Sequence, residues 1–247
     1  MLQNKIPVLR ITRADLNGSG EYAASDSIDF DGHIEIGQNL GCVRFRGGIK
    51  AGGRISALTG TGIAAAADII AGAGIMAAGC IDAGGRIIAG GKIAAGAGIW
   101  AGKSVNAGKS IVAEDGITAD GNIIAGNDIK TRGSIASDSN IDAGADIVAG
   151  WEVKANLRIA AAKSIKAGGS IIAGNDIRSG GSIEAELSIT SGFSICCKQR
   201  IVAGLRIFAG ICPRMKPKPN QTVIEAAKIE GEVCFGKVRL LKQIEDK

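Results

Sequence analysis

Branched aliphatic residues recur every six positions along most of this chain. Between Asp68 and Gly102 they stand at Ile69, Ile75, Ile81, Ile87, Ile93 and Ile99. The spacing continues unbroken from Ile63 to Ile207, with valine replacing isoleucine only at Val105 and Val153. A small residue, usually alanine, follows two positions after each aliphatic, and glycine commonly comes next. The consensus is therefore I-x-A-G-x-x.

This hexad pattern fits a short strand and excludes a helix. Six helical residues advance the chain by about 240° around the axis, so successive isoleucines would lie on three different faces. In an extended I-x-A segment the first and third side chains share one face and the middle side chain points the other way. A strand of three residues cannot bury its own apolar face, so it must stack on copies of itself. The pattern predicts an all-β fold, a single-stranded parallel β-solenoid with G-x-x corners.

The outward position of each hexad suggests the size of one coil. In alternate hexads this position is mostly apolar, as at Met76, Ile88, Trp100, Val112, Ile124, Val148, Ile172 and Phe208, whereas the hexads between them are mostly polar. The near-copies "IIAGNDIK" at Ile123 and "IIAGNDIR" at Ile171 lie 48 residues apart, a multiple of twelve but not of eighteen. We therefore expect two hexads, twelve residues, per coil and a flattened solenoid with two sheets. A triangular coil of three hexads is the alternative.

The two ends depart from the hexad pattern. We expect residues 1–42 to form an N-terminal cap, residues 43–212 the solenoid repeats, and residues 213–247 a C-terminal cap that reads as a hairpin or a final pair of strands. Caps at both ends would cover the open strand edges, which otherwise invite end-to-end polymerisation.

Composition narrows the chemistry. Aromatic residues make up only 3% of the chain, and His33 is its one histidine. The six cysteines include no CxxC pair, so neither a structural zinc site nor any other metal or cofactor is expected. No apolar run approaches the roughly 20 residues of a membrane span, and residues 1–30 lack a signal-peptide pattern. We expect a cytoplasmic protein with reduced thiols and no membrane contact.

The I-x-A-G-x-x run over residues 43–212 resembles the hexapeptide-repeat β-solenoid class. That class includes left-handed β-helix acyltransferases and the bactofilins, bacterial proteins that polymerise end to end. The order of this repeat differs from the usual hexapeptide, because the large aliphatic comes first and the small residue third. With "IDFDGHIEIGQNLGCVRF" ahead of it, the pattern is also similar to solenoid proteins encoded by phages and prophages.

These features favour a non-enzymatic role. An acyltransferase of this class would need a catalytic histidine, and His33, which precedes the uninterrupted hexads, is interpreted as an ordinary cap residue. The alternate apolar positions, Met76, Ile88, Trp100, Val112, Ile124, Val148, Ile172 and Phe208, are predicted to line one outer face and to form a homodimer interface or receive another protein. The opposite face carries Lys130, Lys154, Lys166 and Arg178, a candidate surface for an anionic partner. Without interleaved aromatic residues, however, nucleic acid is not expected.

Two functions stay open on the sequence. The first is a protein–protein interaction module, of phage origin on the resemblance above, that binds or inhibits a host protein and self-associates through the apolar face. The second is a bactofilin-like scaffold that forms filaments.

Overall fold

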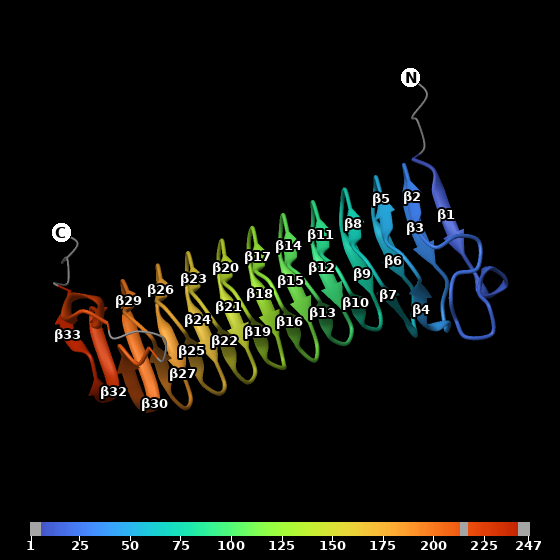
Figure 1. Ribbon diagram of the computed structural model, residues 1–247. Coiled ribbons are helices and arrows are strands. Elements are labelled where there is room, and N and C mark those ends of the chain that lie inside the picture. The colour runs from blue at the N-terminus through green and yellow to red at the C-terminus, as the bar shows by residue number, and fades with distance from the viewer. Residues whose placement is uncertain (1–5, 213–216, 242–247) are drawn as a thin grey trace, which may run out of the picture. The chain divides into compact units, whose positions relative to one another are not determined.

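The computed structural model describes residues 6–212 and 217–241, and almost all of its regular secondary structure consists of short parallel strands joined by corners (Figure 1). The chain divides into two compact units, unit 1 (residues 1–126) and unit 2 (residues 127–247). Within the described residues the only helical segments are two 3₁₀ turns, η1 (Arg13–Asp15) and η2 (Pro219–Gln221). The predicted all-β parallel solenoid is confirmed.

In each unit the strands form three faces, numbered here by their order along one coil. Face 1 of unit 1 contains β2 (Ile28–Phe30), β5 (Ile49–Ala51), β8 (Ile69–Ala71), β11 (Ile87–Ala89), β14 (Val105–Ala107) and β17 (Ile123–Ala125). Face 2 contains β1 (Val8–Ile11), β3 (His33–Ile36), β6 (Ile55–Ala57), β9 (Ile75–Ala77), β12 (Ile93–Ala95) and β15 (Ile111–Ala113). Face 3 contains β4 (Gly41–Phe45), β7 (Thr61–Ala65), β10 (Ile81–Ala83), β13 (Ile99–Ala101) and β16 (Ile117–Ala119).

Unit 2 repeats this plan. Its face 1 contains β20 (Ile141–Ala143), β23 (Ile159–Ala161), β26 (Ile177–Ser179), β29 (Ile195–Cys197), β31 (Val223–Ala226) and β33 (Lys237–Leu240). Face 2 contains β18 (Ile129–Thr131), β21 (Ile147–Ala149), β24 (Ile165–Ala167) and β27 (Ile183–Ala185). Face 3 contains β19 (Ile135–Ser137), β22 (Val153–Ala155), β25 (Ile171–Ala173) and β28 (Ile189–Ser191). The long strands β30 (Arg200–Ala209) and β32 (Lys228–Phe235) run along face 2 and continue onto face 3.

One coil holds three hexads, so the prediction of a twelve-residue coil is wrong and the triangular alternative is correct. From β2 to β27 each strand pairs with the third strand after it, as β10 does with β13, where Ile81 lies opposite Ile99, 18 residues on. The first coils are slightly longer, because Ile55 lies opposite Ile75. The six-residue repeat is compatible with a coil of 12 or of 18 residues. The twelve-residue period is found only in the alternation of apolar and polar outward side chains.

The inward positions build the core as the sequence predicts. In a typical strand such as β10, Ile81 is fully buried and Ala83 is 1% exposed, while the middle residue, Asp82, is exposed. Burial of an isoleucine side chain stabilises by about 1.5–3 kcal/mol before the entropy of ordering is subtracted. Three isoleucines of each coil therefore fill a triangular interior, and the small alanines leave room for them.

At several corners the residue before the aliphatic is Asp, Asn or Ser, and these side chains form a second ladder. The side-chain oxygen accepts the backbone N–H of the equivalent residue one coil later. In unit 2, Asp128 Oδ1 accepts from Asp146 N (3.1 Å), Asp146 Oδ1 from Ser164 N (2.9 Å), and Ser164 Oγ from Ser182 N (3.2 Å). Each such bond satisfies an amide that the strand ladder leaves unpaired at the corner.

Glycine follows the strands because successive coils approach closely at the corners. A Cβ on Gly90 would lie 2.2 Å from the carbonyl oxygen of Gly72, and a Cβ on Gly108 would lie 2.2 Å from that of Gly90. Hexads with a larger residue at this position require a local shift of the corner. The close approach accounts for the G in I-x-A-G-x-x.

We expect Asp146→Ala to lower the free energy of unfolding by about 1–3 kcal/mol, because the Ser164 amide loses its acceptor. Asp146→Asn keeps an oxygen at that position and is expected to stay close to wild type. Chemical denaturation followed by circular dichroism measures both. The matched control is Asp142→Ala, which removes only the surface ion pair with Arg158, worth less than about 1 kcal/mol. Equal losses for the alanine and asparagine variants at position 146 would contradict the corner ladder.

Two corner carboxylates make the fold sensitive to acid. The Arg86 side chain and backbone N–H hold the pKa of Asp68 below its usual 3.8, and the Asp146 amide and Lys130 do the same for Asp128. Because these folded-state pKa values are depressed, their contribution is complete above about pH 4 and is lost as the pH falls through the lowered values. The Asp68→Asn/Asp128→Asn variant should therefore lose less stability between about pH 5 and pH 2 in urea unfolding. Identical pH slopes for variant and wild type would refute this.

Candidate interaction surfaces

The one histidine has a structural partner. His33 Nδ1 accepts the Arg54 backbone N–H at 3.0 Å, so this ring occupies the same corner position as the Asp and Ser side chains of later coils. Within residues 6–212 and 217–241, no group of three His, Cys, Asp or Glu side chains could hold a metal ion. In that same part of the chain, no helix is long and apolar enough to span a membrane.

The predicted apolar stripe does not lie on one face. The 18-residue coil distributes its members over all three faces, since Trp100 lies on face 3 of unit 1 and Ile172 on face 3 of unit 2. The others are Met76 and Val112 on face 2 and Ile88 and Ile124 on face 1 of unit 1, and Val148 on face 2 and Phe208 on face 3 of unit 2. These eight residues therefore do not form one continuous dimer interface on a single face.

The predicted basic surface is dispersed in the same way. In unit 2, Lys130 and Lys166 lie on face 2 with Val148 between them, Lys154 lies on face 3, and Arg178 on face 1. Lys130 pairs with Asp128 at 3.0 Å and Arg178 with Asp176 at 3.3 Å. These four residues do not converge on one anionic partner.

The structure instead shows an apolar ridge along one corner of unit 2. Trp151, Leu187 and Leu205 occupy the same corner at multiples of the 18-residue coil, with Gly169 between the first two, and they are 69%, 47% and 57% exposed. Backbone hydrogen bonds link this corner from coil to coil, from Leu205 N to Leu187 O and from Leu187 N to Gly169 O. Sequence reasoning missed the ridge because these residues occupy G-x-x positions, which it treated only as turns.

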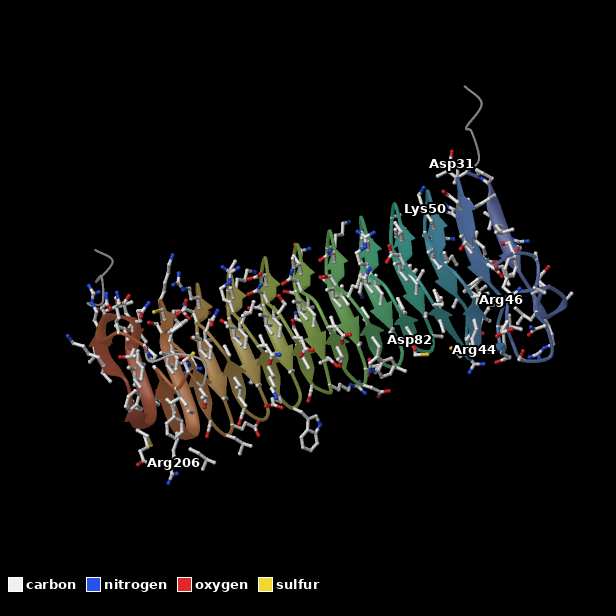
Figure 2. All side chains as sticks on the ribbon, viewed as in Figure 1. Asp31, Arg44, Arg46, Lys50, Asp82 and Arg206 are labelled. Carbon is white, nitrogen blue, oxygen red and sulfur yellow. The ribbon has the colours of Figure 1, made fainter. Side chains whose placement is uncertain are left out.

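A shallow groove of about 480 Å³ lies on face 3 of unit 1. Arg44 and Arg46 border one side and Asp82 the other, and the small residues Ala64 and Gly84 form part of its floor. Figure 2 shows the three charged residues along the same side of the unit. Arg44 donates to the Ser19 carbonyl and Arg46 pairs with Asp26 at 3.0 Å, so both guanidinium groups are already partly engaged.

The first coil of unit 1 has shielded core positions. Ile11 at the end of β1 is 1% exposed and Ile28 in β2 is 8% exposed. The segment between these strands turns through η1 and returns to pair Glu21 with Arg44 on face 3. Strands β2 and β3, which were assigned to a cap, already stack on the coils that follow.

The last coil of unit 2 is exposed. Residues 217–241 form no hairpin: β31 pairs in parallel with β29, β32 with β30, and β33 with β31. Among the described residues nothing pairs with the outer edges of β32 and β33, and every residue of β33 is exposed. Val238 and Leu240 are 46% and 63% exposed, although the residues opposite them in the preceding coil, Ile224 and Ala226, are fully buried. Phe235, which lies opposite the outward residue Phe208, is 54% exposed. The rest of the segment predicted as a C-terminal cap, residues 213–216 and 242–247, lies outside the described residues.

Comparisons with protein-family models, with curated proteins and with solved structures find no match to this chain.

Proposed function

We propose that this protein is a non-enzymatic scaffold whose copies join as a homodimer through the last coil of unit 2. The supporting observation is the open edge of β32 and β33, where apolar side chains in core positions are exposed. Unpaired strand edges bind other strands, and proteins usually cover or blunt them. Here the exposed edge carries the same inward pattern that is buried in every preceding coil.

A second copy of the same coil fits this edge better than the first coil of unit 1. Ile11 and Ile28 are already buried in the first coil, and its exposed apolar residues, Ile6 and Val8, lie before β1 and at the corner where β1 begins rather than in core positions. Two last coils related by a two-fold axis would present the same surface to each other in a closed, isologous contact. Their strands would then pair antiparallel across the junction.

Charge complementarity supports this arrangement. Arg239 projects outward from face 1 of the last coil, where it pairs with Glu225 at 3.2 Å. Glu230 projects outward from face 2, where it pairs with Lys228 at 2.8 Å. A two-fold axis through face 3 places face 1 of each copy against face 2 of the other. Arg239 of one copy then lies beside Glu230 of the other, twice per dimer, while Val233 and Phe235 of the two copies meet on face 3.

A second candidate function is the binding of another protein along the apolar ridge of Trp151, Leu187 and Leu205. Exposed tryptophan and leucine side chains at one corner are typical of protein-binding surfaces. This role is compatible with the dimer, because the ridge follows the corner of unit 2 and leaves the edges of β32 and β33 free. A host protein would be one such partner.

We expect the wild-type protein to sediment at twice its chain mass of 25.0 kDa at micromolar concentration. Arg239→Glu should weaken the dimer about tenfold or more, because each copy would then place like charges side by side at the junction. The exchange Arg239→Glu/Glu230→Arg restores opposite charges across the junction and should recover most of the affinity. Analytical ultracentrifugation measures all three proteins.

The matched control is Arg178→Glu, the same charge reversal on face 1 of an inner coil, which should leave the dimer unchanged. Circular dichroism establishes that each variant keeps its strands. A wild-type monomer, or long filaments seen by electron microscopy, would overturn the proposed dimer, and filaments would favour the bactofilin-like scaffold. Failure of the charge exchange to restore affinity would reject the two-fold arrangement.

A further inference from the structure

Two cysteine side chains meet on the outside of unit 1 near the start of face 3. The sulfur atoms of Cys42 and Cys80 are 3.8 Å apart, although the residues are separated by 38 positions in the chain. Cys42 lies on β4 and Cys80 immediately precedes β10. Both side chains are half-buried.

Strand β7 lies between the two cysteines, and Gly62 of this strand has no side chain to separate them. Cys42 is paired with Gly62 of β7, and a Cβ on Gly62 would lie only 2.9 Å from the Cys80 sulfur. Gly62 therefore leaves the space in which the two thiols approach each other across β7. A side chain at this position would push the sulfur atoms apart.

The same geometry disfavours a disulfide. An intervening strand separates the two backbones by nearly two inter-strand spacings of about 4.8 Å each. A disulfide requires Cα atoms within about 7 Å and an S–S bond of about 2 Å. Closing the bond would pull β4 and the corner before β10 together across β7, whose hydrogen bonds hold them apart.

We propose that Cys42 and Cys80 form a two-thiolate site for a soft monovalent metal ion, of which Cu(I) is the biological example. Soft thiolate ligands select Cu(I), which accepts two sulfur ligands on opposite sides. With bonds no longer than the roughly 2.3 Å of zinc–thiolate sites, a linear bridge spans at most about 4.6 Å, so the sulfurs need to separate by less than about 1 Å. Side-chain rotation alone supplies that movement.

The charge balance suits a monovalent ion. Binding converts two thiols and one M⁺ ion into an M(SR)₂ complex of charge −1 and releases two protons to solvent. Arg44 acts electrostatically on Cys42 and offsets part of that charge, whereas the carboxylate of Asp82 acts in the opposite direction.

The test uses the full chain with the other four cysteines replaced, Cys196→Ser/Cys197→Ser/Cys212→Ser/Cys234→Ser. Anaerobic titration with Cu(I) against a chromogenic chelator should show one ion bound per chain. X-ray absorption should report two sulfur ligands and no nitrogen. Adding Cys42→Ser or Cys80→Ser should weaken binding at least 100-fold, and Gly62→Val, which fills the gap between the thiols, should also weaken it.

Three results would overturn the site. The first is the absence of one-to-one binding in the four-serine protein. The second is binding that survives Cys42→Ser. The third is ready closure of a Cys42–Cys80 disulfide by oxidised glutathione, detected by mass spectrometry of peptides, because it would show that the backbones can approach. Circular dichroism of every variant separates loss of the site from loss of the fold.

Discussion

Parallel pairing between one coil and the next is the interaction on which this whole structure depends. A three-residue strand has no partner within its own coil, so its backbone groups and its isoleucine are satisfied only by the coils before and after it. Ile81 is fully buried because β7 and β13 lie on either side of β10 and the other two faces close the interior. Any coil that lacks a neighbour on one side must expose both its strand edge and its core positions.

The same stacking explains how apolar and polar side chains are distributed on the outer faces. A twelve-residue alternation wrapped on an 18-residue coil makes apolar and polar residues alternate along each face, as with Lys130, Val148 and Lys166 on face 2 of unit 2. Like charges are then separated by two spacings, about 9.6 Å, which is close to the Debye length at physiological ionic strength. Aliphatic residues are likewise interrupted before they form a continuous patch. The alternation therefore limits both repulsion along a face and nonspecific association through it.

The sequence predicts the strand and its inward pattern but not the number of strands per coil. Hexads of the form I-x-A-G-x-x give Ile81 and Ala83 the same burial in a two-sided or a three-sided coil. The twelve-residue alternation of outward residues predicted a coil with two sheets only on the assumption that each outer face is either apolar or polar throughout. Long-range pairs such as Asp68 with Arg86, whose side chains approach to 2.7 Å, carry the 18-residue spacing, yet nothing local in the sequence distinguishes them from neighbours twelve apart. Cys42 and Cys80 were missed for the same reason, since their approach depends on coil length and on Gly62 between them.

The first and last coils each lack a stacked coil on one side, and they differ in how far their core positions are shielded there. In the first coil, chain that leaves the hexad pattern between Ile11 and Ile28 returns to pair beside Arg44, and the core positions are shielded. In the last coil, β32 and β33 keep the inward–outward pattern to Leu240, so the described chain supplies strands but no cover. Among the described residues, the pattern that buries side chains elsewhere leaves Val238 and Leu240 exposed here. The proposed dimer would give this last coil the stacked neighbour that every inner coil already has.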